Sequence, residues 1–314
     1  MVDTRIVFMG TPEFAVQVLK DLLEHKFNVV GVITAPDKPS GRGRKLNESA
    51  VKKYAVEQNI PVLQPVNLKS DTFLNELKLL NANLQIVVAF RMLPKVVWQL
   101  PQLGTFNLHA SLLPNYRGAA PINWAIINGE TKTGVTTFFI DEKIDTGEII
   151  IQDEVVISEI DTAGSLHDKL MAIGGKLVVK TVKLIEKGNI KTSKQPSNET
   201  NPAPKIYKET CKINWTYNAH TIYNKIRGLS PYPVAWTIID NIDNVIEAKI
   251  YSATKEIISH KHDIGNIITT KNELKIAVND GYLIIDEIQL PGKRKMKTID
   301  LLNGYTFHTN AKAV

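Results

Sequence analysis

The sequence predicts a two-domain α/β protein in which a mostly parallel sheet, covered by helices, precedes a small β-barrel. Short β-branched runs alternate with amphipathic helical patterns over the first two-thirds of the chain, which is typical of a parallel sheet with helices on both faces. A stretch rich in Pro, Ser, Thr and Asn follows, and then come five short strand patterns at steady spacing. That spacing indicates an all-β unit, and 314 residues are enough for two cores.

The first domain is expected to build its sheet from short apolar runs at 5–9, 29–33, 62–63, 84–89, 105–109, 135–140 and 148–157. Helical periodicity lies between them at 51–58 and 71–80, and a long amphipathic helix over 163–186 closes the domain. The first helix has the clearest beginning. Thr11 is expected to cap it, and Pro12 suits the first helical position because the missing N–H is not needed there.

The apolar periodicity almost disappears after residue 187, which indicates an extended linker. We therefore expect three parts: a first domain over 1–187, a linker over 188–205 and a C-terminal barrel over 206–314. The barrel strands are expected at 235–239, 245–251, 265–269, 274–278 and 283–288.

Composition excludes several classes of protein. Hydrophobic residues make up 43% and charged residues 22%, which excludes bulk disorder, and Cys211 is the only cysteine, which excludes an internal disulfide and disfavours a cysteine-based metal site. No apolar run approaches the roughly 20 residues of a membrane span, and the N-terminus lacks a signal-peptide pattern. We expect a cytoplasmic monomer without membrane association. The net charge of +6 permits a polyanionic partner without requiring one.

The expected sheet carries no nucleotide fingerprint. Gly10-Thr11-Pro12 does not match GxGxxG and no Walker pattern occurs, so nothing supports NAD or ATP. Open α/β sheets nevertheless bind ligands beyond the carboxyl ends of their strands. The candidate site is therefore expected at that edge.

Asn107 and His109 stand at the end of one expected strand, and residues two apart on a strand face the same side. An amide donor beside an imidazole suits acyl-type transfer, because the amide stabilises developing negative charge on oxygen and the imidazole moves a proton. Asp145, in Asp145-Thr146-Gly147, is placed to orient His109. The alternative interpretation is a strand end with ordinary polar residues and a simple turn.

These residues, taken in order, resemble the signature of the 10-formyl-tetrahydrofolate-dependent formyltransferases. The signature is Asn107-x-His109 followed by Ser111-Leu112-Leu113-Pro114 and Gly118, with Asp145-Thr146-Gly147 behind it. The resemblance implies a Rossmann-like sheet domain with an OB-like barrel, 10-formyl-tetrahydrofolate as co-substrate and no metal. It also implies that Asn107, His109 and Asp145 are catalytic and that Ser111, Leu112, Leu113 and Pro114 contribute to the folate site.

The rest of the chain is similar to the methionyl-tRNA formyltransferases within this family, which implies initiator methionyl-tRNA as partner. The similar segments are 10–15, 36–46, 118–122, 213–215, 227–236, 292–296 and 301–303. One segment departs from the pattern. Family members commonly have Ala-Tyr-Gly and an apolar run where this chain has Ala89-Phe90-Arg91-Met92-Leu93-Pro94. That loop is expected to cradle the pteridine through backbone groups, so contacts there should differ in detail.

Two basic clusters are candidates for binding tRNA. Arg42, Arg44 and Lys45 lie on a glycine-containing loop that can order against RNA phosphates, although a solvated flexible loop is the alternative. Lys293-Arg294-Lys295 forms the second cluster, at the end of an expected barrel strand. Small barrels often bind nucleic acid along one face.

Two other functions stay open at this point. One is formyl transfer to a small amine, such as an amino sugar nucleotide or glycinamide ribonucleotide. The all-β domain and the loop around Arg42 argue against it, because a small substrate has no use for them. The other is a catalytically inactive nucleic-acid-binding protein, which the intact Asn107, His109 and Asp145 disfavour.

Overall fold

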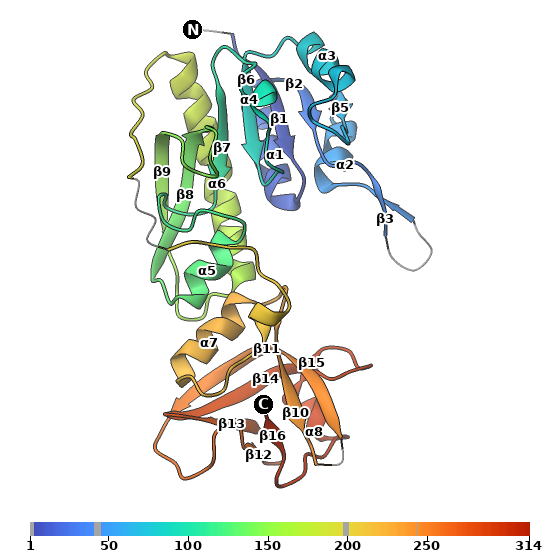
Figure 1. Ribbon diagram of the computed structural model, residues 1–314, viewed down its shortest axis with the longest axis vertical. Helices are drawn as coiled ribbons and strands as arrows, with labels where there is room; N and C mark the ends of the chain where they lie inside the picture. Colours follow the sequence, from blue (N-terminus) through green and yellow to red (C-terminus); the bar gives the residue numbers. More distant parts are fainter. Residues whose placement is uncertain (1–2, 41–44, 197–200, 243) are drawn as a thin grey trace. The chain divides into compact units, whose positions relative to one another are not determined.

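The computed structural model describes the chain except residues 1–2, 41–44, 197–200 and 243 (Figure 1). It contains two compact units, each assembled from three stretches of sequence. The sheet unit comprises Met1–Gly118, Thr133–Val155 and His167–Pro202, and the barrel unit comprises Ala119–Lys132, Val156–Leu166 and Ala203–Val314. The predicted fold class, a mostly parallel α/β sheet followed by an antiparallel barrel, is confirmed.

The sheet unit contains a seven-stranded sheet in the order β5-β2-β1-β6-β7-β8-β9. Its strands are β1 (Arg5–Gly10), β2 (Asn28–Ile33), β5 (Val62–Leu63), β6 (Leu84–Val88), β7 (Thr105–His109), β8 (Lys132–Phe139) and β9 (Ile149–Val156). The first five pair in parallel, and β8 runs antiparallel to β7. The carboxyl ends of β1, β6 and β7 therefore meet at one edge, where ligands of such sheets bind.

Four of the five described helices of this part of the chain were predicted, and the short one at 95–98 was not. They are α1 (Glu13–Glu24), α2 (Ala50–Glu57), α3 (Asp71–Leu79), the short α4 (Lys95–Trp98) and α6 (Ala163–Glu186). The predicted cap of α1 is wrong: Pro12, not Thr11, is the N-cap, with extended ψ of 177° and no side-chain hydrogen bond. The Pro12 carbonyl accepts from the N–H groups of Ala15 and Val16, so the helix starts one residue later than expected. Ser49 and Ser70 do cap α2 and α3.

The barrel unit follows the strand order β12-β13-β14-β11-β10-β16, with β15 added on β14. An isolated antiparallel bridge between Asn266 and Lys312 lies between the two ends of this order, so the ring is nearly closed. The strands are β10 (Ala235–Asp240), β11 (Val245–Ile257), β12 (Ile267–Thr269), β13 (Leu274–Val278), β14 (Gly281–Gln289), β15 (Met296–Lys297) and β16 (Lys312–Ala313). Alternate residues of β10 and β11 fill the interior, among them Ala235, Ile239, Ala248 and Ile250.

Three helices and one 3₁₀ turn complete the barrel unit: α5 (Pro121–Ile127), η1 (Glu209–Cys211), α7 (Ala219–Gly228) and α8 (Thr298–Leu302). The Asn218 side chain caps α7 by accepting from the Thr221 N–H. Ile222 and Ile226, one turn apart, place α7 against the barrel core. Of these elements, η1, α7 and α8 were not predicted from the sequence.

Candidate active site

The end of β7 carries the two polar residues that the sequence singled out. Asn107 pairs with Val87 of β6 and Phe138 of β8, and His109 lies opposite Thr136 of β8. Leu108 between them is buried, as strand alternation requires. The Asn107 carboxamide is half-buried and makes no side-chain hydrogen bond to another described residue. It is therefore available as a donor to a ligand.

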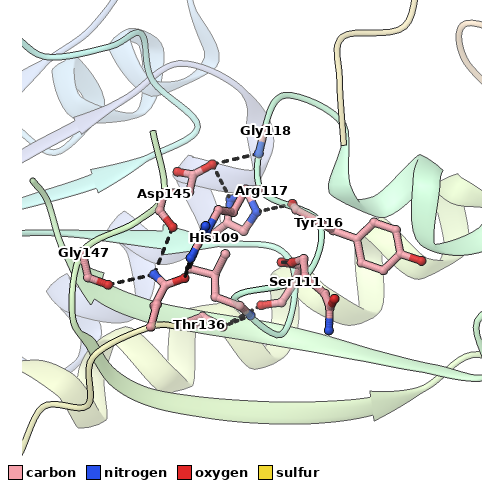
Figure 2. A network of polar contacts seen from close by, with 11 residues as sticks. His109, Ser111, Tyr116, Arg117, Gly118, Thr136, Asp145 and Gly147 are labelled. Carbon is pink, nitrogen blue, oxygen red and sulfur yellow. Dashed lines mark hydrogen bonds and ion pairs between the residues drawn. The ribbon is translucent and has the colours of Figure 1, made fainter. Parts of the chain in front are cut away.

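His109 is held by a backbone carbonyl. Its Nε2 lies 2.8 Å from the carbonyl oxygen of Tyr116, and a carbonyl can only accept, so Nε2 carries the proton. In the neutral ring Nδ1 is then an acceptor. Nδ1 lies 3.7 Å from Asp145 Oδ2, which is an ion-pair distance but too long for a hydrogen bond. Figure 2 shows this arrangement, with both side chains largely buried.

Asp145 lies in the connection between β8 and β9, with a left-handed backbone at φ +55° that Asp tolerates better than most residues. Its Oδ2 accepts a hydrogen bond of 2.9 Å from the Gly118 N–H (Figure 2). Gly147 is required by close packing, because a Cβ there would lie 1.6 Å from the Phe139 carbonyl oxygen. The Asp145-Thr146-Gly147 tripeptide is thus more constrained than an ordinary turn.

The segment 111–114 is fixed by side chains of β8 and β9. Thr136 Oγ1 donates to the Ser111 carbonyl at 2.6 Å and accepts from the Leu113 N–H at 3.2 Å. Gln152 Nε2 donates to the Leu113 carbonyl at 3.0 Å. The Ser111 hydroxyl already donates to the Asn115 carbonyl, at 2.6 Å. Because the Ser111 hydroxyl and most backbone polar groups of this segment are already paired, mainly its shape and apolar surface are left for contact with a ligand.

Comparison with known proteins establishes the family of the chain. A family model described as formyl transferase matches residues 4–182, and one described as formyl transferase, C-terminal domain, matches residues 205–306. Methionyl-tRNA formyltransferase of Flavobacterium johnsoniae is 56% identical over 313 residues, covering 99% of each chain. That of Bacteroides thetaiotaomicron is 52% identical over 309 residues, covering 96% of each. The chain belongs to the methionyl-tRNA formyltransferase family.

Solved structures share the fold of the family at lower identity. An N-formyltransferase from Helicobacter canadensis, solved with folinic acid and dTDP-3-aminofucose, aligns with a TM-score of 0.62 and 23% identity, over 91% of this chain and 98% of that one. HypX from Aquifex aeolicus, in complex with tetrahydrofolic acid, aligns with a TM-score of 0.64 and 18% identity, over 96% of this chain and 47% of that one. A structure holding a sugar nucleotide thus aligns through most of both units. The presence of a barrel alone does not separate tRNA from small substrates.

The loop that departs from the family pattern has its own anchoring. Arg91 Nη1 donates to the Val66 carbonyl at 3.0 Å, and Nη2 donates to the Pro65 carbonyl. The guanidinium also lies over the Phe90 ring, 5.7 Å from its centroid. The charge of Arg91 therefore ties this loop to the segment after β5.

The predicted tRNA-binding residues fall into described and undescribed groups. Arg42 and Arg44 lie outside the described residues, and of Lys45 only the backbone is described. It pairs with Ser40 where β3 (Lys38–Ser40) and β4 (Lys45–Asn47) run antiparallel to each other, within the segment expected to be a loop. In the second cluster Lys293, Arg294 and Lys295 are all exposed. The Lys295 ammonium lies 2.8 Å from Glu287 Oε2, so part of its charge is already balanced.

A basic and aromatic row on the outside of the barrel was missed from the sequence. Trp236 lies opposite Lys249 in the pairing of β10 with β11, and the backbone of Lys212 forms an isolated parallel β-bridge with that of Trp236. The ammonium groups of Lys208 and Lys212 lie 5.0 and 5.9 Å from the Trp236 ring centroid, within cation–π range. The available signal was alternation, because the half-buried Trp236 and the exposed Lys249 alternate with the buried Ala235 and Ala248. We call Lys212, Trp236 and Lys249 the outer row.

Two negative findings hold for the described part of the chain. Its His, Cys, Asp and Glu side chains form no group of three or more that could hold a metal ion. No helix in it combines the length and apolar character needed to cross a membrane.

Proposed function

We propose that this chain transfers the formyl group of 10-formyl-tetrahydrofolate to the α-amine of methionyl-initiator tRNA. One observation carries the proposal: 56% identity along 99% of the chain to a methionyl-tRNA formyltransferase. The convergence of Asn107, His109 and Asp145 at one sheet edge gives that identity a chemical basis.

In the proposed reaction the amine nitrogen attacks the formyl carbon, a new C–N bond forms and the carbonyl oxygen becomes an oxyanion. The free Asn107 carboxamide donates to that oxygen. His109 enters neutral, with Nε2–H bound to the Tyr116 carbonyl, so only Nδ1 can act. Nδ1 accepts the proton released by the amine, and the nearby Asp145 carboxylate stabilises the resulting imidazolium.

The protonated His109 then completes the cycle. Its Nδ1–H, which is absent in the neutral ring, can donate to the oxyanion beside Asn107. When the intermediate collapses, the bond from the formyl carbon to folate N10 breaks and N10 takes the proton from His109 Nδ1, which returns the imidazole to its neutral form. Segment 111–114 and the loop 89–94 flank this edge of the sheet as the proposed folate contacts, the former through the apolar surface of Leu112 and Pro114.

The proposed division of labour places formyl transfer in residues 1–187 and tRNA binding in the barrel of 206–314, with 188–205 as the connection. Lys293, Arg294 and the outer row offer positive charge to the tRNA backbone, and Trp236 offers a ring for stacking. Arg42, Arg44 and Lys45 are proposed to guide the acceptor end. We propose that the chain acts as a monomer in the cytoplasm.

The deciding experiment is mass spectrometry of the aminoacyl moiety after incubation of purified protein with 10-formyl-tetrahydrofolate and methionyl-tRNA. The expected result is a gain of one formyl group on methionine that requires the folate donor. Parallel reactions offer an amino sugar nucleotide and glycinamide ribonucleotide. Product from these amines alone would replace the proposed acceptor, and no folate-dependent product from any amine would remove the enzymatic function.

A further inference from the structure

Gln195 lies in the segment that follows α6, a stretch whose composition gives no sign of a role in the site. Backbone hydrogen bonds pair Ser193, two residues earlier, with Ile149 of β9, at 2.9 Å in both directions. This pairing fixes the position of Gln195 next to the connection between β8 and β9. The side chain is half-buried.

The Gln195 carboxamide uses its full hydrogen-bonding capacity. Its Nε2 donates to the carbonyl oxygens of Asp145 and Gly147, at 2.9 and 2.7 Å. Its Oε1 accepts from Arg117 Nε and Nη2, at 3.2 and 2.7 Å. A primary amide has two N–H donors and one oxygen with two lone pairs, so both ends are occupied. One side chain therefore joins the Asp145 turn to the Arg117 loop.

The Arg117 loop is the same loop that holds the catalytic candidates (Figure 2). Tyr116 supplies the carbonyl that receives His109 Nε2–H, and Gly118 supplies the N–H bound to the Asp145 carboxylate. Arg117, between them, points its guanidinium to Gln195. Three consecutive residues thus connect His109, Gln195 and Asp145.

We infer that Gln195, together with Arg117, is a positioning residue that fixes Asp145 relative to His109. The 3.7 Å separation of Asp145 Oδ2 from His109 Nδ1 depends on two loops that are distant in sequence. Gln195 links these loops without touching either reacting side chain. The inference rests on the proposed function, because it assigns Gln195 a role only through His109 and Asp145.

The hydrogen bonds of Gln195 predict which substitutions of this residue lower kcat. Gln195→Leu keeps the approximate size and removes every hydrogen bond. Gln195→Glu keeps an acceptor for Arg117, but it loses both donors and places a carboxylate against two carbonyl oxygens. Both variants should lower kcat by about 10- to 100-fold, since a misplacement near 1 Å can cost about 10² in rate. The KM values for folate and tRNA should stay within about twofold of wild type.

Arg117→Met breaks the same link from its other end, and it leaves the Asp145 turn untouched. We expect Arg117→Met to lower kcat by less than the Gln195 variants do, because Gln195 still donates to the Asp145 and Gly147 carbonyls. Lys194→Ala is the matched control, since Lys194 is the exposed neighbour on the same segment and its backbone is unchanged. That control should retain wild-type kcat. The thermal unfolding midpoint of each variant shows whether it is folded. If the Gln195 variants do not fold, the kcat of Arg117→Met tests the inference instead.

A double-mutant test separates positioning from general damage. If Gln195 acts through His109, adding Gln195→Leu to His109→Ala should lower kcat by less than about twofold, since coupled residues are not additive. The inference would be overturned if Gln195→Leu lowered kcat by the same factor in the wild-type protein and in His109→Ala. It would also be overturned if Gln195→Leu had wild-type kcat while His109→Ala was slow. Wild-type turnover by His109→Ala itself would instead reject the proposed catalytic site.

Discussion

At the end of β7 the side chains of His109 and Asp145 are each held by a backbone group, whereas on the outside of the barrel lysines extend into solvent. His109 is buried and fixed by the Tyr116 carbonyl, and Asp145 is fixed by the Gly118 N–H. Lys212 and Lys249 are exposed, and no carboxylate of a described residue forms an ion pair with either. The first region is preorganised for a specific geometry. The second offers charge that adapts to a flexible polyanion.

This difference has an energetic consequence. In a preorganised site each donor is aimed at one atom, so a single loss is not compensated by its neighbours. On an exposed basic surface each ammonium is solvated and screened, and several can substitute for one another. Substitutions should therefore have large effects on turnover in the first region and small, salt-dependent effects on binding in the second. The following predictions test that contrast, from the largest effect to the smallest.

The largest effect is expected from Asn107→Ala and His109→Ala, each lowering kcat by about 10²–10³ because one oxyanion donor or the proton acceptor is lost. Folate binding should remain within about twofold, measured by titration of a non-reactive folate analogue. His25→Ala is the matched control, since His25 is an exposed histidine at the end of α1. Near wild-type kcat in either site variant would end the catalytic assignment.

Asp145→Asn should cost about 10² in kcat. The asparagine keeps an oxygen for the Gly118 N–H and tolerates the left-handed backbone, but it cannot stabilise the imidazolium. Asp141→Asn, in the same connection, removes a carboxylate that bonds only Thr146 and the Lys143 N–H among described residues. Steady-state kinetics on both should show a defect in the first alone. Equal defects would mean that the charge of Asp145 has no special role.

Substitutions in the two predicted tRNA-binding clusters should have different effects on the kinetic constants. Arg42→Ala should lower kcat about tenfold as well as raise KM for tRNA, because a misplaced acceptor end loses alignment with the formyl carbon. Neutralising Lys293, Arg294 and Lys295 together should raise KM for tRNA and flatten its salt dependence, with kcat largely kept. A salt series on both variants distinguishes them. Identical defects would show that the tRNA surface has been assigned wrongly.

The smallest effects are expected on the outer row. Lys212→Gln should raise KM for tRNA about threefold and reduce the slope of log KM against log salt by about 1, the value for one phosphate contact. Lys208→Gln is the matched control, since the Lys208 ammonium lies 2.7 Å from Glu247 Oε2 and its charge is partly balanced. An equal effect in both would argue against a specific contact at Lys212. No change in either would place the tRNA on another face.

Much of the scaffold was predictable because its signals are local. The helix predicted over 163–186 coincides with α6, and the run at 105–109 coincides with β7. Strand alternation placed Asn107 and His109 on one side and Leu108 in the core. The Thr11 cap failed because Pro12 also has a conformation and a carbonyl suited to that position, and a local pattern does not rank two adjacent candidates.

The sequence by itself determined which polar side chains are candidates for the site and which strand carries two of them, because side-chain chemistry and the two-residue alternation of a strand can be read from the residues themselves. Only the tertiary structure decided how those groups are held. His109 is oriented by a backbone carbonyl, which every residue possesses and no sequence pattern marks. Gln195 contacts Arg117 and Asp145 across 78 and 50 residues of chain. Such contacts exist only after the sheet, its turns and the segment beyond α6 have come together.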